Sequence, residues 1–239
     1  MKLLDLTLPT GEENLALDEA LLELSNQTAE YDDVLRIWEP HAPMVVLGRA
    51  SKATVEVDLD FCRQQGIPVL RRCSGGATVV SMPGCVMYAV TLCLDRFPAL
   101  RVIDKAHQYV LNRIGEAVSS LTDGVKLDGT SDLTIGKKKF SGNSLRCKAN
   151  AILYHGTILN DSSLELISRC LKMPPRQPDY RNQRSHLDFL MNLKLDRDAL
   201  VEQIIRRWDA KEPIKSWPQE DVSRLVKERY SQQTWNFRH

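Results

Sequence analysis

The sequence lacks long apolar runs. None approaches the roughly 20 residues that span a bilayer, and no basic region followed by an apolar stretch marks the N-terminus as a signal peptide. An excess of charge of either sign is also missing, since 32 Lys and Arg stand against 31 Asp and Glu. Without a basic block, nothing favours a nucleic-acid or membrane partner. We therefore expect a soluble, cytoplasmic protein.

Cysteine pairs and nucleotide-binding motifs are missing as well. The six cysteines form no C-x-x-C pair and have no histidine partners at zinc spacing, which argues against a disulfide framework and against a metal site. We expect most of them to be buried as small apolar side chains. The chain contains neither G-x-x-x-x-G-K-S/T nor G-x-G-x-x-G, so doubly wound nucleotide-binding folds are disfavoured.

The composition is typical of a globular protein. The chain has 239 residues, of which 43% are hydrophobic and 26% charged, enough for one large domain with a sizeable core. Apolar residues at helical spacing predict helices over 14–24, 58–65, 104–121, 163–171, 196–208 and 220–230. Short apolar runs predict strands over 34–38, 44–47, 67–70, 78–94, 132–135, 138–140 and 151–159. This order predicts an α+β fold, with a mixed, largely antiparallel sheet packed with helices.

The first candidate site lies where a predicted strand runs into Arg71 and Arg72 and then into Ser74, Gly75 and Gly76. Glycines at such a turn let backbone N–H groups approach an anionic or carbonyl-bearing ligand, and an arginine offers a forked donor for phosphate or carboxylate. A tight turn between strands, with two solvated arginines, explains this stretch equally well.

The second candidate site is the lysine run 137–139 followed by Ser141 and Gly142. A lysine beside such a turn could hold a carboxylate and a phosphate together and stabilise the charge as they exchange. Three consecutive lysines more often mark a solvated hairpin tip. Two separate Ser-Gly turns, each beside a cation, favour the functional interpretation.

Six short segments together resemble the lipoate-protein ligase A family in order and spacing. They are Asn14-Leu15-Ala16-Leu17-Asp18-Glu19, Gly48-Arg49, Arg71-Arg72-Cys73-Ser74-Gly75-Gly76, Gly129-Thr130-Ser131-Asp132-Leu133, Lys139-Phe140-Ser141-Gly142-Asn143 and His155-Gly156-Thr157. Each is weak alone, but together they cover nearly the whole chain. Residues 228–237 also resemble the end of that family's catalytic domain.

The resemblance implies the fold of biotin and lipoate protein ligase catalytic domains, with ATP, accompanying Mg²⁺ and lipoate as ligands. In that family the carboxylate and ATP condense to an acyl-adenylate. The acyl group then passes to a lysine of a carrier domain, such as a 2-oxoacid dehydrogenase E2 domain or a glycine-cleavage H-like protein.

The resemblance also assigns roles to particular residues. Lys139 matches the catalytic lysine that bridges the acyl carbonyl and the α-phosphate. Acyl- or adenylate-binding positions are matched by Arg72, Ser74, Gly75, Gly76, Ala77, Asp132, Ser141, Gly142 and His155. Asp18, Trp38 and Ser81 fall at acyl-pocket positions, although a plain core role explains Trp38 at least as well.

The chain departs from the family pattern in two places. Ala77 stands where a third glycine is usual, and Ser81 and Met82 replace a His-Asp pair. Residues 1–239 match a single catalytic domain, whereas two-domain members continue into an accessory domain that helps to form the adenylate. A separate polypeptide that supplies this domain, acyl transfer alone, and adenylation without the domain are three alternatives.

Two other activities stay open at this point. Octanoyltransferases of this fold use a cysteine nucleophile, and Cys147, between Arg146 and Lys148, is the most electropositive cysteine by sequence. A non-catalytic homologue that binds lipoyl carriers is the other alternative. The arginine- and proline-rich segment 174–186 is either a docking surface or nucleotide contact, or an irregular loop pinned to the domain.

Overall fold

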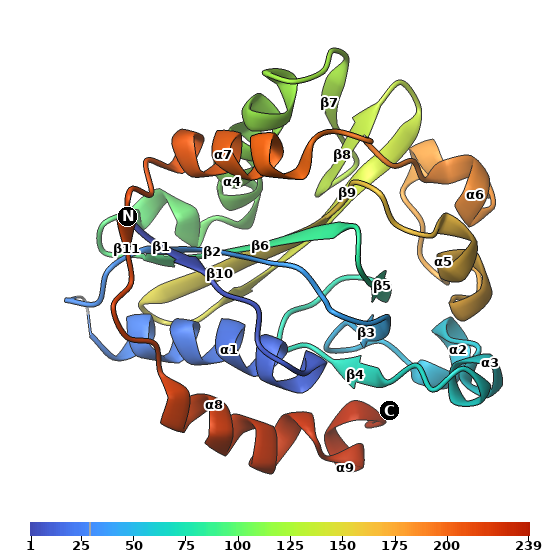
Figure 1. Cartoon of the computed structure of the whole chain (residues 1–239), viewed down its shortest axis with the longest axis horizontal. Coiled ribbons are helices and arrows are strands. Elements are labelled where there is room, and N and C mark those ends of the chain that lie inside the picture. Colours follow the sequence, from blue (N-terminus) through green and yellow to red (C-terminus); the bar gives the residue numbers. More distant parts are fainter. Residues whose placement is uncertain (29) are drawn as a thin grey trace.

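Figure 1 shows the computed structural model of the chain, which describes residues 1–28 and 30–239. Its main feature is an eight-stranded sheet in the order β11-β1-β2-β6-β10-β9-β8-β7. β1 pairs in parallel with β11 and β2, whereas the pairings from β2 to β7 are antiparallel. The strands are β1 Lys2–Asp5, β2 Val34–Trp38, β6 Cys85–Cys93, β7 Val125–Asp128, β8 Asp132–Ile135, β9 Lys138–Cys147, β10 Ala151–Leu159 and β11 Glu212–Pro213.

Helices cover both faces of this sheet. They are α1 Gly11–Gln27, α4 Ile103–Ser119, α7 Arg197–Trp208 and α8 Gln219–Leu225. α4 and α7 lie on one face and α1 lies on the other, with α8 packed on the outer side of α1 (Figure 1). Side chains alternate along a strand, so a buried strand supplies both layers. In β2, Leu35 and Ile37 pack in the α4 and α7 layer, whereas Trp38 packs in the α1 layer.

A second, three-stranded sheet in the order β4-β3-β5 lies beside the large one (Figure 1). Its strands are β3 Met44–Leu47, β4 Val69–Arg71 and β5 Val79–Ser81. Short helices surround it: α2 Ala53–Glu56, α3 Leu59–Gln64, α5 Leu164–Cys170, α6 His186–Phe189 and α9 Gln233–Asn236. Apolar residues of β3 and β5 share one core cluster with side chains from α5 and α6.

The α+β prediction is confirmed, and several predicted elements agree closely with the structure. β2, β3 and β10 have the predicted bounds. The strand predicted over 78–94 is two strands, because a turn at Met82–Gly84, in which Gly84 has a φ of +85°, separates β5 from β6. The strand predicted over 138–140 extends to Cys147, and the predicted helix over 220–230 ends in a π-helical turn, Val226–Tyr230.

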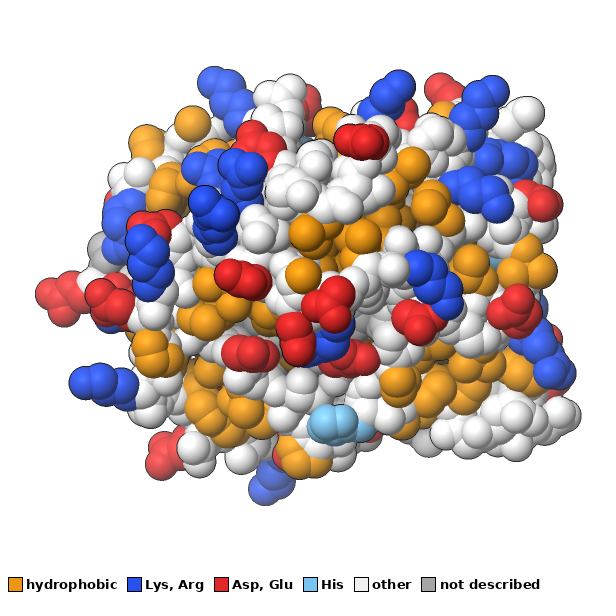
Figure 2. Space-filling model, turned by 45° about the horizontal axis from the view of Figure 1, so that its top comes forward, with side chains coloured by type: hydrophobic (Ala, Val, Ile, Leu, Met, Phe, Trp, Pro, Cys, Tyr) orange, Lys and Arg blue, Asp and Glu red, His pale blue; other side chains and the backbone are white. Residues whose placement is uncertain are grey.

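The distribution of surface charge and the burial of the cysteines agree with the expectations from composition. Basic and acidic side chains are interspersed over the face in Figure 2. The six cysteines form no disulfide with one another, and all except the half-buried Cys147 are buried. Among the residues that the structure describes, no helix has the length and apolarity to cross a membrane.

Candidate active site

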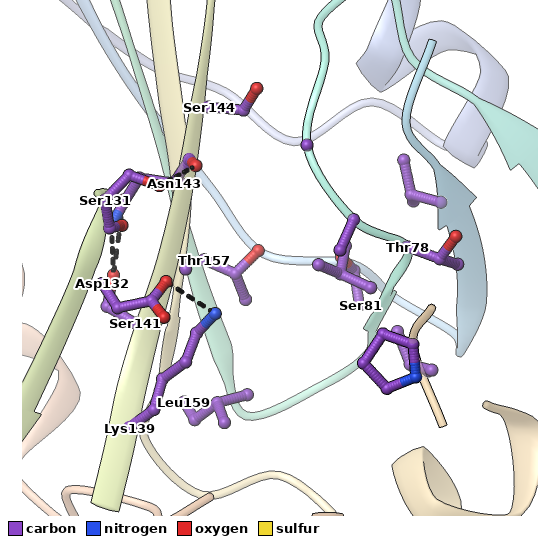
Figure 3. A pocket seen from close by; sticks show the side chains of 18 of the residues that line it. Thr78, Ser81, Ser131, Asp132, Lys139, Ser141, Asn143, Ser144, Thr157 and Leu159 are labelled. Atoms are coloured by element: carbon purple, nitrogen blue, oxygen red, sulfur yellow. Dashed lines mark hydrogen bonds and ion pairs between the residues drawn. The ribbon is translucent and has the colours of Figure 1, made fainter. Parts of the chain in front are cut away.

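A cavity of about 420 Å³ opens between β5 of the small sheet and the β8 to β10 part of the large sheet. Figure 3 shows Lys139 and Asp132 on one side of it, opposite Thr78 and Ser81. Much of its wall is apolar, formed by Leu15, Trp38, Val46, Val80, Met87, Leu159, Ile167 and Phe189. A cavity with a largely apolar wall and a few polar groups, among them Lys139 and Asp132, fits an amphipathic ligand.

An ion pair marks the polar side of the cavity. Lys139 Nζ lies 2.7 Å from Asp132 Oδ1 (Figure 3). Asp132 pairs with Gly142 across the β8 and β9 strands, and Thr134 pairs with Lys139. From Asp132 to Thr134 the chain advances two residues, whereas from Gly142 back to Lys139 it covers three, so β9 contains one extra residue. This β-bulge places Lys139 on the same face of the sheet as Asp132. Without the bulge, strand alternation would point the lysine to the opposite face.

Gly142 provides the space that Lys139 occupies. A Cβ atom at this position would lie 2.8 Å from Nζ and 2.9 Å from Cε of the lysine. The absence of a side chain therefore lets the lysine fold back along its own strand toward Asp132. The Ser141-Gly142 turn expected from the sequence is instead part of the continuous strand β9.

The opposite rim is the loop of residues 74–77, which Arg72 holds. Its guanidinium donates to the Ser74 hydroxyl at 3.0 Å and to the carbonyl oxygens of Val46, Gly75 and Ala77. Burial lowers the pKa of Arg72 to about 10. Arg72 therefore shapes the loop with most of its donors, and it also lines the cavity.

The loop itself depends on close backbone contacts. Gly76 has a φ of +82°, and a Cβ on Gly48 would lie 1.9 Å from the Gly76 carbonyl oxygen. Ala77 is not among the described residues with positive φ, so its side chain is accommodated without backbone strain where the family usually has glycine. In the part of the chain that the structure describes, no hydrogen-bond acceptor meets the N–H groups of Gly75, Gly76 and Ala77. Of these three residues, Gly76 and Ala77 line the cavity.

Glu56 anchors the end of the same loop, and the sequence analysis missed it. Its carboxylate accepts hydrogen bonds from the Thr78 hydroxyl at 2.6 Å, from the Thr78 N–H at 3.1 Å and from the Ser51 hydroxyl. Glu56 is buried, in the four-residue helix α2, and no pattern within such a short helix predicts its partners.

A chain of buried polar groups connects the loop to α1 and β2. His155 Nε2 lies 2.5 Å from the Ser74 hydroxyl, and His155 Nδ1 lies 3.1 Å from Asp18. The other oxygen of Asp18 accepts from Arg36 at 2.6 Å. Burial alone would raise the pKa of Asp18, but Arg36 and His155 outweigh it and hold the pKa below its usual value. Arg36, which the sequence analysis also missed, thus keeps this carboxylate charged.

Ser81, Thr157 and Trp38 also line the cavity. Ser81 is fully buried, and its Oγ has no hydrogen-bond partner within the described chain. Ser81 and Thr157 both line the cavity (Figure 3). Trp38 is 2% exposed, belongs to the α1 core and also lines the cavity, so the two roles considered for it coincide.

The segment 172–190 forms another wall. Pro174, Arg176, Pro178 and Arg181 line the cavity, so this segment lies at the site that the resemblance indicates. Arg181 is buried, and its guanidinium stacks over the Phe189 ring at 4.7 Å. Burial lowers the pKa of His186 to about 4, with a smaller contribution from Arg181, which keeps this histidine neutral.

The cysteines lie elsewhere. Cys147 packs against the core on the α4 side and is not among the residues that line the cavity. Burial raises the pKa of the Cys147 thiol, and it raises that of Cys85 to about 11. Its basic sequence neighbours therefore do not activate Cys147 as a thiolate. Within the described residues, no group of three or more His, Cys, Asp or Glu side chains could hold a metal ion.

The fold identifies the structural class of the protein. The architecture is the biotin/lipoate protein ligase catalytic-domain fold, as in a lipoate-protein ligase A solved with bound ATP, which matches 99% of this chain and 98% of its own at a TM-score of 0.80 and 24% identity. A putative lipoate protein ligase from Thermoplasma acidophilum, solved with lipoic acid, covers the same shares at a TM-score of 0.79 and 23% identity.

The sequence comparison specifies the family. Residues 10–211 match the lipoyl protein ligase A/B catalytic domain, and the chain belongs to this family. It is 25% identical to the T. acidophilum lipoate-protein ligase A subunit 1, over 93% of this chain and 90% of that protein. It is 27% identical to a putative lipoate-protein ligase A of Schizosaccharomyces pombe over 80% of this chain but spans only half of that relative. It is also 24% identical to the octanoyltransferase LipM of Clostridioides difficile, over 82% of this chain and 81% of that protein.

Proposed function

We propose that this protein is an ATP-dependent lipoate-protein ligase. It condenses lipoate with ATP to lipoyl-AMP and transfers the lipoyl group to a lysine of a carrier domain. The observation that carries the proposal is the position of Lys139, paired with Asp132 at the wall of a largely apolar cavity that Gly76 and Ala77 of the glycine loop also line. The relatives named as lipoate-protein ligases support the choice of acid.

In the first half-reaction a carboxylate oxygen of lipoate attacks the α-phosphorus of ATP, and pyrophosphate leaves. Negative charge grows on the phosphoryl oxygens, and the Lys139 ammonium stabilises it where Asp132 now holds the amine. The amine can move from Asp132 to the ligand because a lysine is a point charge on a flexible chain.

In the second half-reaction the amine of the carrier lysine attacks the acyl carbonyl, and AMP leaves. The carbonyl oxygen becomes an oxyanion, and Lys139 can contact both this oxygen and the phosphate. The N–H groups of Gly76 and Ala77, which line the cavity and have no acceptor within the described chain, would supply fixed dipoles to the ligand. His155 and Asp18 keep the glycine loop in place through Ser74.

The apolar wall would take the acyl chain, and Ser81 and Thr157 add hydroxyls to it. Magnesium would arrive with ATP and be held mainly by phosphate oxygens. The carrier partner is a lipoyl domain, and residues 1–239 act as one catalytic domain that a separate accessory polypeptide assists. A structure described as a bi-partite lipoate protein ligase of T. acidophilum with its E2 lipoyl domain supports both partners.

ATP-independent octanoyl transfer is the second candidate, and its support is the similarity to LipM. That candidate needs a nucleophile at the cavity, and no cysteine is among the described residues that line it. We therefore favour the ligase.

The test is a reaction of the purified chain with lipoate, ATP, Mg²⁺ and an E2 lipoyl domain, with and without an accessory subunit. Mass spectrometry should detect lipoyl-AMP and a carrier heavier by one lipoyl group. If neither product forms even with the accessory subunit, the ligase proposal is wrong. Carrier acylation from an octanoyl thioester without ATP would support the transferase instead.

A further inference from the structure

Tyr180 lies next to the ion pair, although the sequence analysis gave this residue no role of its own. It lies in a 3-10 helix, Asp179–Arg181, within the arginine-rich segment. Its hydroxyl donates to Asp132 Oδ2 at 2.7 Å, while Asp132 Oδ1 faces Lys139 Nζ at the same distance. Each oxygen of one carboxylate therefore has a single strong partner, and the three side chains form a line from the segment into the cavity.

The surrounding contacts fix the Tyr180 ring. The ring packs on Phe189 with centroids 5.3 Å apart. The ring also approaches the turn between β7 and β8, where a Cβ on Gly129 would lie 3.4 Å from Tyr180 Cε1. Burial, and then the Asp132 carboxylate, raise the pKa of the Tyr180 phenol, so it stays protonated and remains a donor.

The segment is also joined to the strand that carries Lys139. Arg184 donates to the Lys137 carbonyl at 2.8 Å and to the Tyr180 carbonyl at 2.8 Å. The Met191 N–H donates to the carbonyl of Lys139 itself at 3.0 Å. The backbone of β9 is thus held by Arg184 of this segment and by Met191 directly after it, and the carboxylate opposite is held by Tyr180.

We propose that Tyr180 is a positioning residue for Lys139 and acts through Asp132. Its hydroxyl fixes the carboxylate, which in turn holds the lysine amine at the polar side of the cavity until a ligand takes it over. A neutral donor suits this role, because it orients the carboxylate without neutralising it and without competing with Lys139 for the ligand. The expected effect of Tyr180 on adenylation rests on the proposed function. Its effect on the position of the Lys139 amine does not.

The catalytic test is a double-mutant cycle on adenylation. Tyr180→Phe should lower kcat roughly 10- to 100-fold, the range for a hydrogen bond to a charged group, with KM values for lipoate and ATP nearly unchanged. In the Asp132→Ala background, Tyr180→Phe should have no further effect, because the group through which it acts is gone. Tyr109→Phe, on α4 and away from the cavity, is the matched control. An additive effect of the two substitutions would show that Tyr180 acts only by anchoring the segment and would overturn the proposal.

A second measurement needs no ligase activity. The rate at which acetic anhydride labels Lys139, followed by peptide mass spectrometry, reports how firmly Asp132 holds the amine in the free protein. Asp132→Ala should raise this rate, Tyr180→Phe should raise it in the same direction, and the double variant should match Asp132→Ala. An unchanged labelling rate in Tyr180→Phe contradicts the inference. An inactive wild-type protein in which the labelling rates still follow this order contradicts the proposed function alone.

Discussion

The two rims of the cavity use their basic residues in opposite ways. At the β4 and β5 rim, Arg71 is fully buried and donates to the carbonyl oxygens of six residues, namely Gly48, Arg49, Ser51, Trp235, Asn236 and Arg238. Arg72 beside it is occupied by the glycine loop. At the β8 and β9 rim, the Lys139 side chain is 23% exposed and has one ionic partner.

The number of protein partners distinguishes a structural cation from one that is available to a ligand. A guanidinium whose donors all meet protein carbonyls holds segments together and has little left for a ligand. An amine with one exchangeable partner can release it and bind an incoming negative charge. The sequence analysis treated the arginines and Lys139 alike, as cations beside Ser-Gly turns. The contacts show that the arginines hold protein segments together, whereas Lys139 has an exchangeable partner, as the proposed reaction requires.

The largest expected effect is on folding, from Arg71→Ala. The substitution removes the donor from buried carbonyl groups in two parts of the chain, residues 48–51 and 235–238, although the backbone contacts of residue 71 with Trp235 and Asn236 remain. We expect a loss of about 4 kcal/mol or more in the free energy of unfolding, measured by urea denaturation. A loss below about 1 kcal/mol would show that Arg71 is not a structural residue and would remove the contrast between the rims.

The next largest effect is on catalysis, from Lys139→Ala. Loss of the ammonium should lower kcat/KM for carrier lipoylation roughly 100- to 1,000-fold, as for the removal of one preorganised donor at a site of developing charge. Thermal unfolding should change little, because the side chain is partly exposed. The exposed neighbour Lys138, changed to Ala, is the matched control. Equal activities of the two variants would disprove the role of Lys139.

Gly142→Ala should produce a smaller loss. The added Cβ meets the flexible end of Lys139, so the lysine moves and the strand stays in place. We expect kcat to fall roughly 10- to 100-fold, because misplacement of a catalytic group by about 1 Å has effects of this size. The circular dichroism spectrum should be unchanged. Full activity in this variant would mean that the lysine does not need its position beside Asp132.

The smallest effect is expected from Cys147→Ala. This thiol lies outside the cavity, and burial raises its pKa, so carrier acylation should stay within about twofold of the wild-type rate. The assay is run once with lipoate and ATP and once with an octanoyl thioester. Loss of the thioester reaction in this variant would instead support a transferase that uses Cys147 as its nucleophile.

The sequence predicts most of the fold but only part of the site. Strands such as β2 and β10 could be recognised because continuous apolar runs are bounded by polar or turn residues. The sequence also predicts strands over 44–47, 67–70 and 78–94, which contain or overlap the strands of the small sheet. It does not predict that they form a separate sheet, because β4 and β5 have three residues each and pair with β3 over long sequence distances. The resemblance indicated Lys139, Asp132, Ser74 and His155, and the structure brings them to one cavity or its loop.

The partners of these residues needed the structure. Tyr180 reaches Asp132 across 48 residues, and Glu56 reaches Thr78 across 22. No local spacing encodes such contacts, which arise only when the loops fold against the sheets. The bulge that turns Lys139 toward Asp132 is also invisible in the sequence, because it depends on the register of two paired strands.

The most direct test of the difference between the rims is a crystal structure of the protein with lipoate and a non-hydrolysable ATP analogue. We predict that Lys139 Nζ lies within hydrogen-bond distance of the lipoate carboxylate and the α-phosphate, whether or not it also keeps its contact with Asp132. Arg71 and Arg72 should keep their carbonyl partners. A ligand held by either arginine, with Lys139 still paired only with Asp132, would contradict the account.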